Sequence, residues 1–143
     1  MKTTQKDNII FIRLFPNEDI IENILDACEK HQVRTAVVLS AVGQLKDITL
    51  GYFKEKGNYT PQSFKEAHEL LHISGTIIKQ EDKYIPHLHV TLGNEQKMVL
   101  GGHLLKAKVE VTNEIVLLSS DALLKRRLCE DNGLQELILP DAT

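Results

Sequence analysis

The stretch PHLHVTLGNEQKMVLGGH, residues 86–103, decides the fold because it has the pattern of a β-hairpin with two different faces. Polar and apolar side chains alternate in its first half, and the turn-rich segment at 93–97 leaves two strands free to pair. When Leu92 is placed opposite Met98, the apolar side chains of both strands share one face. A slip of one residue would move Met98 to the other face, so the pattern sets the parity of the register.

The opposite face of this hairpin carries three of the six histidines in the chain, His87, His89 and His103. The predicted register places His87 opposite His103 and His89 opposite Gly101. Residues opposite each other lie about 4.5–5.5 Å apart at Cα, and neighbours two apart on one strand about 6.5–7 Å. Three imidazoles at these spacings can reach one ion at about 2.0–2.1 Å. Gly101 leaves room between the rings, and Gly102 permits a bulge or a close approach.

This histidine set predicts a metal site. Three neutral imidazoles without a thiolate suit Zn²⁺ best, with Ni²⁺, Fe²⁺ or Co²⁺ as alternatives. Three protein ligands leave one coordination position open, which is more typical of catalytic or ligand-binding metals than of structural ones. A histidine pair two apart on a strand is also common as two unconnected surface side chains. The third histidine on the matching face is therefore what favours a metal.

Glu69 and Arg34 are the other candidate side chains, as ligand-binding or outer-sphere residues. Glu69 is predicted on a strand over 67–79, on the face that carries Leu71 and Ile73. A carboxylate among apolar neighbours is costly unless it is paired. We therefore expect it to hold a backbone amide, an arginine or a ligand, with Arg34 as the candidate arginine. A purely structural ion pair is the alternative.

The rest of the chain predicts a fold of the α+β (α/β) class. Helices are expected over 17–32 and 121–133, where apolar residues recur at helical spacing. Short connections favour a mostly antiparallel sheet of about seven or eight strands, with the two helices packed against it. The expected strands are 8–16, 34–43, 45–53, 67–79, the two arms of the hairpin, 107–120 and 134–140.

Composition is that of an ordinary globular protein, with 143 residues, 42% hydrophobic content and a net charge of −3. A single domain over 1–143, with a core over about 8–139, is expected. No run approaches the roughly 18 apolar residues of a membrane span, and MKTTQKDN at the amino terminus lacks an apolar signal core. A cytoplasmic protein without a membrane partner is therefore expected. A solvated helix face explains the densest basic cluster, 125–127, at least as well as a nucleic-acid surface does.

Four pieces of the sequence occur in an order and at a spacing that resemble one protein family. They are VRTAVVLSAVGQLKDITLGYF (33–53), HELLHISGTI (68–77), PHLHV (86–90) and VLGGHL (99–104). Together they resemble the PPC domain family (plants and prokaryotes conserved domain, also called domain of unknown function 296, DUF296). The pair HLHV and GGHL is its most specific part. With TNEIVLL and EDNGLQELIL as closing strands, the resemblance spans nearly the whole chain.

The resemblance implies an α/β fold, a homotrimer and, in prokaryotic members, a zinc site at the three histidines, here His87, His89 and His103. Glu69 falls where plant members carry the glutamate of an Arg-Phe-Glu-Ile-Leu stretch, and only it and its apolar neighbours match. DNA binding is implied by the family label alone. The nuclear plant members carry AT-hook motifs ahead of the domain, and this sequence contains no Gly-Arg-Pro core of such a motif.

Two functional hypotheses follow. The first is a homotrimeric zinc-binding module, which senses or carries a small anionic or carbonyl ligand at the open metal position. The second is a zinc-dependent hydrolase or lyase, with Glu69 or a neighbouring histidine as the base. No glutamate or aspartate lies within two positions of His87, His89 or His103, so the sequence offers no assured general base. The binding module is preferred, and whether the chain is an enzyme stays open.

Overall fold

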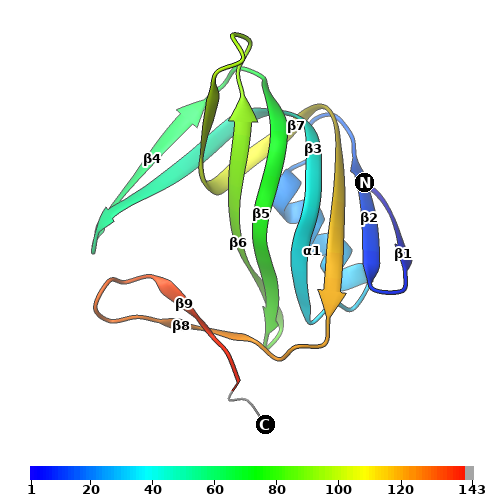
Figure 1. Ribbon diagram of the computed structural model, residues 1–143, viewed down its shortest axis with the longest axis vertical. Coiled ribbons are helices and arrows are strands. Elements are labelled where there is room, and N and C mark those ends of the chain that lie inside the picture. Colours follow the sequence, from blue (N-terminus) through cyan, green and yellow to red (C-terminus); the bar gives the residue numbers. More distant parts are fainter. Residues whose placement is uncertain (141–143) are drawn as a thin grey trace.

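The structure, a computed structural model, describes residues 1–140 of the chain. Within this part the chain forms nine strands and one helix (Figure 1). In chain order these are β1 (Lys2–Lys6), β2 (Ile9–Leu14), α1 (Ile20–Lys30), β3 (Thr35–Glu55), β4 (Asn58–Phe64), β5 (His68–Gln80), β6 (Lys83–Gly93), β7 (Val99–Ser120), β8 (Lys125–Leu128) and β9 (Gln135–Ile138).

Seven of the strands form one sheet in the order β1-β2-β7-β6-β5-β3-β4, and each neighbouring pair is antiparallel. β7 also pairs with β3, so β3, β5, β6 and β7 close into a ring. Strands of 21 and 22 residues let β3 and β7 serve two sets of neighbours. Register shifts along their shared edge mark where they bend.

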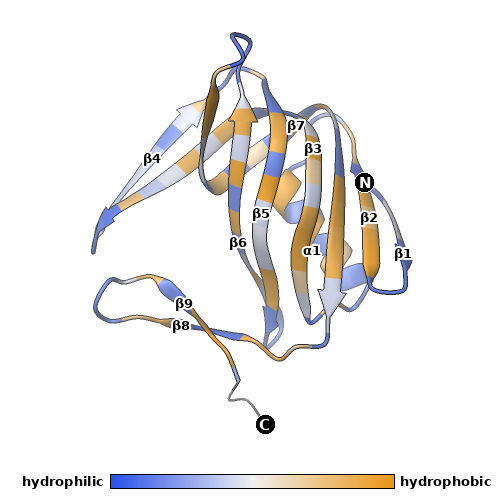
Figure 2. Ribbon diagram, in the orientation of Figure 1, coloured by the Kyte–Doolittle hydropathy of each residue, from blue (hydrophilic) through white to orange (hydrophobic). Residues whose placement is uncertain are grey.

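The helix α1 closes one side of the core. Asp19 caps it, because its carboxylate accepts the first-turn backbone N–H groups at 2.9 and 3.0 Å. The buried side chains of α1 are Ile20, Ile24, Ala27 and Cys28, which join a single apolar cluster with β2, β3, β5, β6 and β7. Figure 2 shows the apolar residues of these strands alternating with polar ones. No helix within residues 1–140 has both the length and the apolar character needed to cross a membrane.

The predicted fold class is wrong in its helix content. The mostly antiparallel sheet is present, but the segment 121–133 forms no helix, and the protein is closer to all-β. The segment instead enters the hairpin of β8 and β9, which pairs Arg126 with Leu137. Gly133 turns the hairpin at φ +76°, with its N–H donating to the carbonyl of Cys129. Tertiary hydrogen bonds from Arg126 outweigh the helical spacing of the leucines.

Four strand assignments also differ from prediction. β7 joins the second arm of the predicted hairpin and the predicted strand 107–120 into one strand. β3 continues through Gly43, so the predicted strands 34–43 and 45–53 are one bent strand. β4 lies in a segment for which no strand was predicted, because it follows the turn-forming residues around Gly57. β1 was missed because its five residues are all polar, although Asp7 and Asn8 supply the turn that pairs it with β2.

Candidate metal centre

The hairpin of β6 and β7 forms, but its register is two residues away from the predicted one. His89, rather than His87, lies opposite His103. The loop closes on Asn94, whose N–H donates to the carbonyl of Met98 at 3.0 Å and whose side chain accepts the Met98 N–H at 2.8 Å. This local asparagine bond fixes the loop. A shift of two preserves parity, so all three histidines remain on one face.

The structure brings the three imidazoles together. Ring centroids lie 5.2 Å apart for His87 and His89, 5.3 Å for His87 and His103, and 5.2 Å for His89 and His103. One ligand nitrogen from each ring lies within 4.8 Å of the other two. The Nε2 atoms of His87 and His89 are 3.3 Å apart. Two nitrogens at about 2.0–2.1 Å from a tetrahedral zinc are separated by roughly 3.3–3.4 Å, so His87 and His89 have the spacing of two zinc ligands.

The electrostatics of the cluster favour neutral imidazoles. His87 and His89 are exposed and His103 is half-buried. Burial lowers the pKa of His87, helped by the positive charges of Arg126 and His89. Burial also lowers the pKa of His103, with further contributions from His87, His89 and Arg126. Both rings are therefore neutral at neutral pH, which is the form that binds a metal.

The backbone beneath the cluster depends on close strand contact. Gly101 lies opposite Thr91, and a Cβ there would stand 2.4 Å from the carbonyl oxygen of Val90. The role of Gly101 is thus to allow this approach, instead of leaving room between rings. A Cβ at Gly102 would lie 3.3 Å from the carbonyl oxygen of Gly51, which is a tight contact, and 3.5 Å from Leu50 Cβ.

Tyr59, on β4, is a neighbour that the sequence did not predict. Its ring stands edge-on to that of His103, with 6.0 Å between the centroids and 88° between the planes. Burial raises the pKa of the Tyr59 phenol, so the hydroxyl stays protonated near neutral pH. No strand was expected between 53 and 67, so no sequence signal placed this ring near the cluster.

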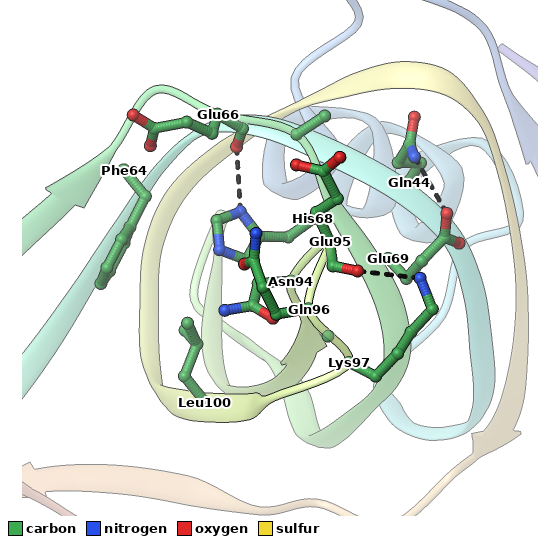
Figure 3. Close-up of a pocket in the computed structure, with 12 residues that line it drawn as sticks. Gln44, Phe64, Glu66, His68, Glu69, Asn94, Glu95, Gln96, Lys97 and Leu100 are labelled. Atoms are coloured by element: carbon green, nitrogen blue, oxygen red, sulfur yellow. Dashed lines mark hydrogen bonds between the residues drawn. The ribbon is translucent and has the colours of Figure 1, made fainter.

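Glu69 lies outside the histidine cluster. Its side chain is exposed and accepts a hydrogen bond from Gln44 Nε2 at 2.9 Å (Figure 3). A bulge between Leu70 and His72 changes the alternation of β5, so Leu70 points inward and Glu69 outward. Glu69 lines an open hollow of about 700 Å³ beside the 94–97 loop, and none of the three clustered histidines lines that hollow.

Arg34 is not the partner of Glu69. Gln44 lies opposite Glu69, whereas Thr35, the residue after Arg34, lies opposite Ile78. Along β3, Thr35 and Gln44 are nine residues apart, which corresponds to roughly 30 Å in an extended strand. The Arg34 side chain is exposed, and its backbone carbonyl accepts the N–H of Lys79 at 2.8 Å. Neither predicted outer residue therefore reaches the three imidazoles.

Arg126 is the second neighbour that the sequence did not predict. It was expected on a solvated helix face, yet it is 7% exposed and lies on β8. Its Nη2 donates to Thr76 Oγ1 at 3.0 Å. Thr76 lies directly opposite His87, so the guanidinium reaches the histidine face of the sheet.

Comparison with known proteins shows which family the chain belongs to. The model of the Plants and Prokaryotes Conserved (PCC) domain matches residues 1–121. The chain belongs to this family. Its PCC fold superposes with a TM-score of 0.81 on a metal-containing protein of Archaeoglobus fulgidus, at 28% identity over 96% of this chain and 99% of that one. A Bacteroides thetaiotaomicron protein whose name proposes DNA binding gives a TM-score of 0.90 at 22% identity, over 96% of each chain, and shows the shared fold alone.

This PCC-domain chain also matches part of a larger relative. It is 31% identical over 110 residues to the bifunctional protein GlmU of a Synechococcus strain. The match covers 76% of this chain and 16% of that relative. The chain thus spans about a sixth of the length of the curated relative that it matches.

Proposed function

We propose that this PCC-domain protein is a homotrimeric zinc-binding module that holds a small ligand, in a sensing, carrying or regulatory role. The observation that carries the proposal is the convergence of His87, His89 and His103 within 4.8 Å on one sheet face. Three neutral imidazoles suit zinc, and they leave one coordination position for a small molecule. We take residues 1–143 as one domain and expect it in the cytoplasm.

A binding role is preferred to a zinc-dependent hydrolase or lyase. Among the described residues, the group with metal-ligand spacing contains three histidines and no carboxylate. Glu69, the sequence candidate for a general base, bonds Gln44 and lines a different hollow. A general base must come within hydrogen-bond reach of the proton it removes. Nucleic-acid binding enters through family names, and the net charge of −3 does not favour it.

The metal content of the purified protein tests the proposal. We expect about one equivalent of zinc per chain after purification without a histidine tag, because three preformed imidazole ligands converge. Mass-spectrometric metal analysis after dialysis gives the stoichiometry. A protein that retains less than about a tenth of an equivalent, even when zinc is supplied before dialysis, would contradict the proposed function.

A homotrimer is supported by the apolar surface of the single chain. Phe11 is 49% exposed, Leu39 47% and Leu71 47%, so the single chain leaves large apolar side chains available for contact with another copy. β1 and β4 also leave the two edges of the main sheet unpaired. Light scattering is expected to give about three times the chain mass of 16.2 kDa. A mass that stays near 16.2 kDa at all concentrations would be incompatible with the trimer.

A further inference from the structure

Arg126 is a buried positive charge that has no negative partner among residues 1–140. It is 7% exposed, and none of the five ion pairs among the described residues includes it. Nη2 donates to Thr76 Oγ1 at 3.0 Å, and Nη1 donates to the carbonyl of Gln135 at a long 3.4 Å. Nε has no acceptor in the part of the chain that the structure describes. The guanidinium therefore uses two of its five N–H donors, and both acceptors are neutral.

Such an arrangement is costly unless a negative group completes it. A guanidinium stays protonated at neutral pH, so it cannot reduce the cost of burial by losing its charge. A buried charge that lacks a partner destabilises the folded protein. Fixing the hairpin does not require the charge, because the backbone N–H of Arg126 already bonds Gln80 Oε1 at 2.8 Å.

The guanidinium lies on the side of the sheet that carries the proposed metal site. Thr76, its closest acceptor, is directly opposite His87 across β5 and β6. Opposite residues of an antiparallel pair point to the same face. In Figure 1, β8 runs outside the main sheet, near one end of β5 and β6.

Building on the metal site proposed above, we propose that Arg126 recognises an oxyanion group of a small molecule bound there. The group is a carboxylate or a phosphate. One of its oxygens would occupy the position that the three histidines leave open, and another would accept from the guanidinium. Planar guanidinium N–H groups match carboxylate and phosphate oxygens in geometry and charge. This oxyanion would provide the counter-charge that Arg126 lacks among residues 1–140.

Anion titration of the cobalt-loaded protein tests this inference. Co²⁺ is the probe metal, since its visible spectrum reports changes in coordination, and inorganic phosphate and acetate are the two probe anions. We expect at least one anion to shift the spectrum of the wild-type protein. Arg126→Gln is expected to bind that anion about tenfold more weakly or worse, the loss of a charge-assisted hydrogen bond. Arg127→Gln, which removes an exposed arginine next to it, is the matched control and should bind like wild type.

Each result separates this inference from the metal site itself. Cobalt that fails to bind the wild-type protein overturns both. Cobalt binding with no spectral response to either anion, or equal anion affinity in Arg126→Gln and wild type, overturns only the role of Arg126. A stronger response to phosphate or to acetate assigns the anion class. If Arg126→Gln is unfolded by circular dichroism, Arg126→Lys replaces it. Lysine keeps the charge without the planar fork, so severalfold weaker binding is expected, and unchanged affinity would overturn the inference.

Discussion

Replacing His89 by alanine is expected to lower the zinc affinity of the protein by more than about a hundredfold, since loss of even an outer-sphere partner costs roughly 10–100-fold. His89 is the ring closest to both others, with centroids at 5.2 Å from His87 and from His103. Its removal leaves two imidazoles, which hold a divalent ion poorly. Competition with a coloured zinc chelator measures the affinity. His89 is exposed, so the fold should be spared.

His72→Ala is the matched control for this change. His72 is also an exposed histidine, and it lies opposite Thr91, two positions along β6 from His89. It is not part of the three-histidine group. The zinc affinity of the His72→Ala variant should equal that of the wild-type protein. A similar loss of affinity in both variants, or in neither, would mean that the three-histidine cluster does not hold the ion.

Replacing Gly75 by alanine is expected to reduce the free energy of unfolding by about 3 kcal/mol or more, which is at the upper end for single substitutions. Gly75 has φ +136°, and a Cβ there would lie 1.9 Å from the carbonyl oxygen of His87. The added Cβ would collide with the backbone of His87, which cannot rotate away as a side chain can, so β5 and β6 must move apart. Gly75 also separates Ser74, opposite His89, from Thr76, opposite His87. Zinc affinity should therefore fall together with stability.

Gly57→Ala isolates the clash from the backbone conformation. Gly57 also has a positive φ, +76°, but nothing lies within 4 Å of a Cβ added there. The Gly57→Ala variant should lose about 1–2 kcal/mol of unfolding free energy, which is the strain of the left-handed conformation alone. Urea denaturation at one fixed protein concentration compares the two variants, because the stability of an oligomer depends on concentration. Equal losses in both variants would show that contact with the His87 carbonyl is unimportant.

The alternation of side chains in the hairpin was enough to predict which face carries the histidines. His87, His89 and His103 share a face in any register of that parity, so the shift of two residues did not separate them. The register itself depends on the side-chain bond of Asn94 to the N–H of Met98, which decides where the loop closes. Periodicity carries no information about such a bond. Met98 is 66% exposed as a result, although it was expected on the apolar face.

The end of the chain could not be predicted from local pattern. The leucines at 123, 124 and 128 have helical spacing, but Arg126 bonds Gln80 and Thr76, residues 46 and 50 positions away. These contacts exist only once β5 is in place, so they override the helical preference. The outward position of Glu69 has a similar origin, since one bulge in β5 reverses the alternation that had placed it inward.

Anomalous diffraction from crystals of tag-free protein, collected on both sides of the zinc absorption edge, examines the metal site directly. We expect one anomalous peak per chain, at about 2.0–2.1 Å from a nitrogen of each of His87, His89 and His103. A difference map at the same position would also show what fills the remaining coordination position. Crystals grown with zinc that show no peak there, or a peak held by other side chains, would contradict a zinc-binding role for these histidines.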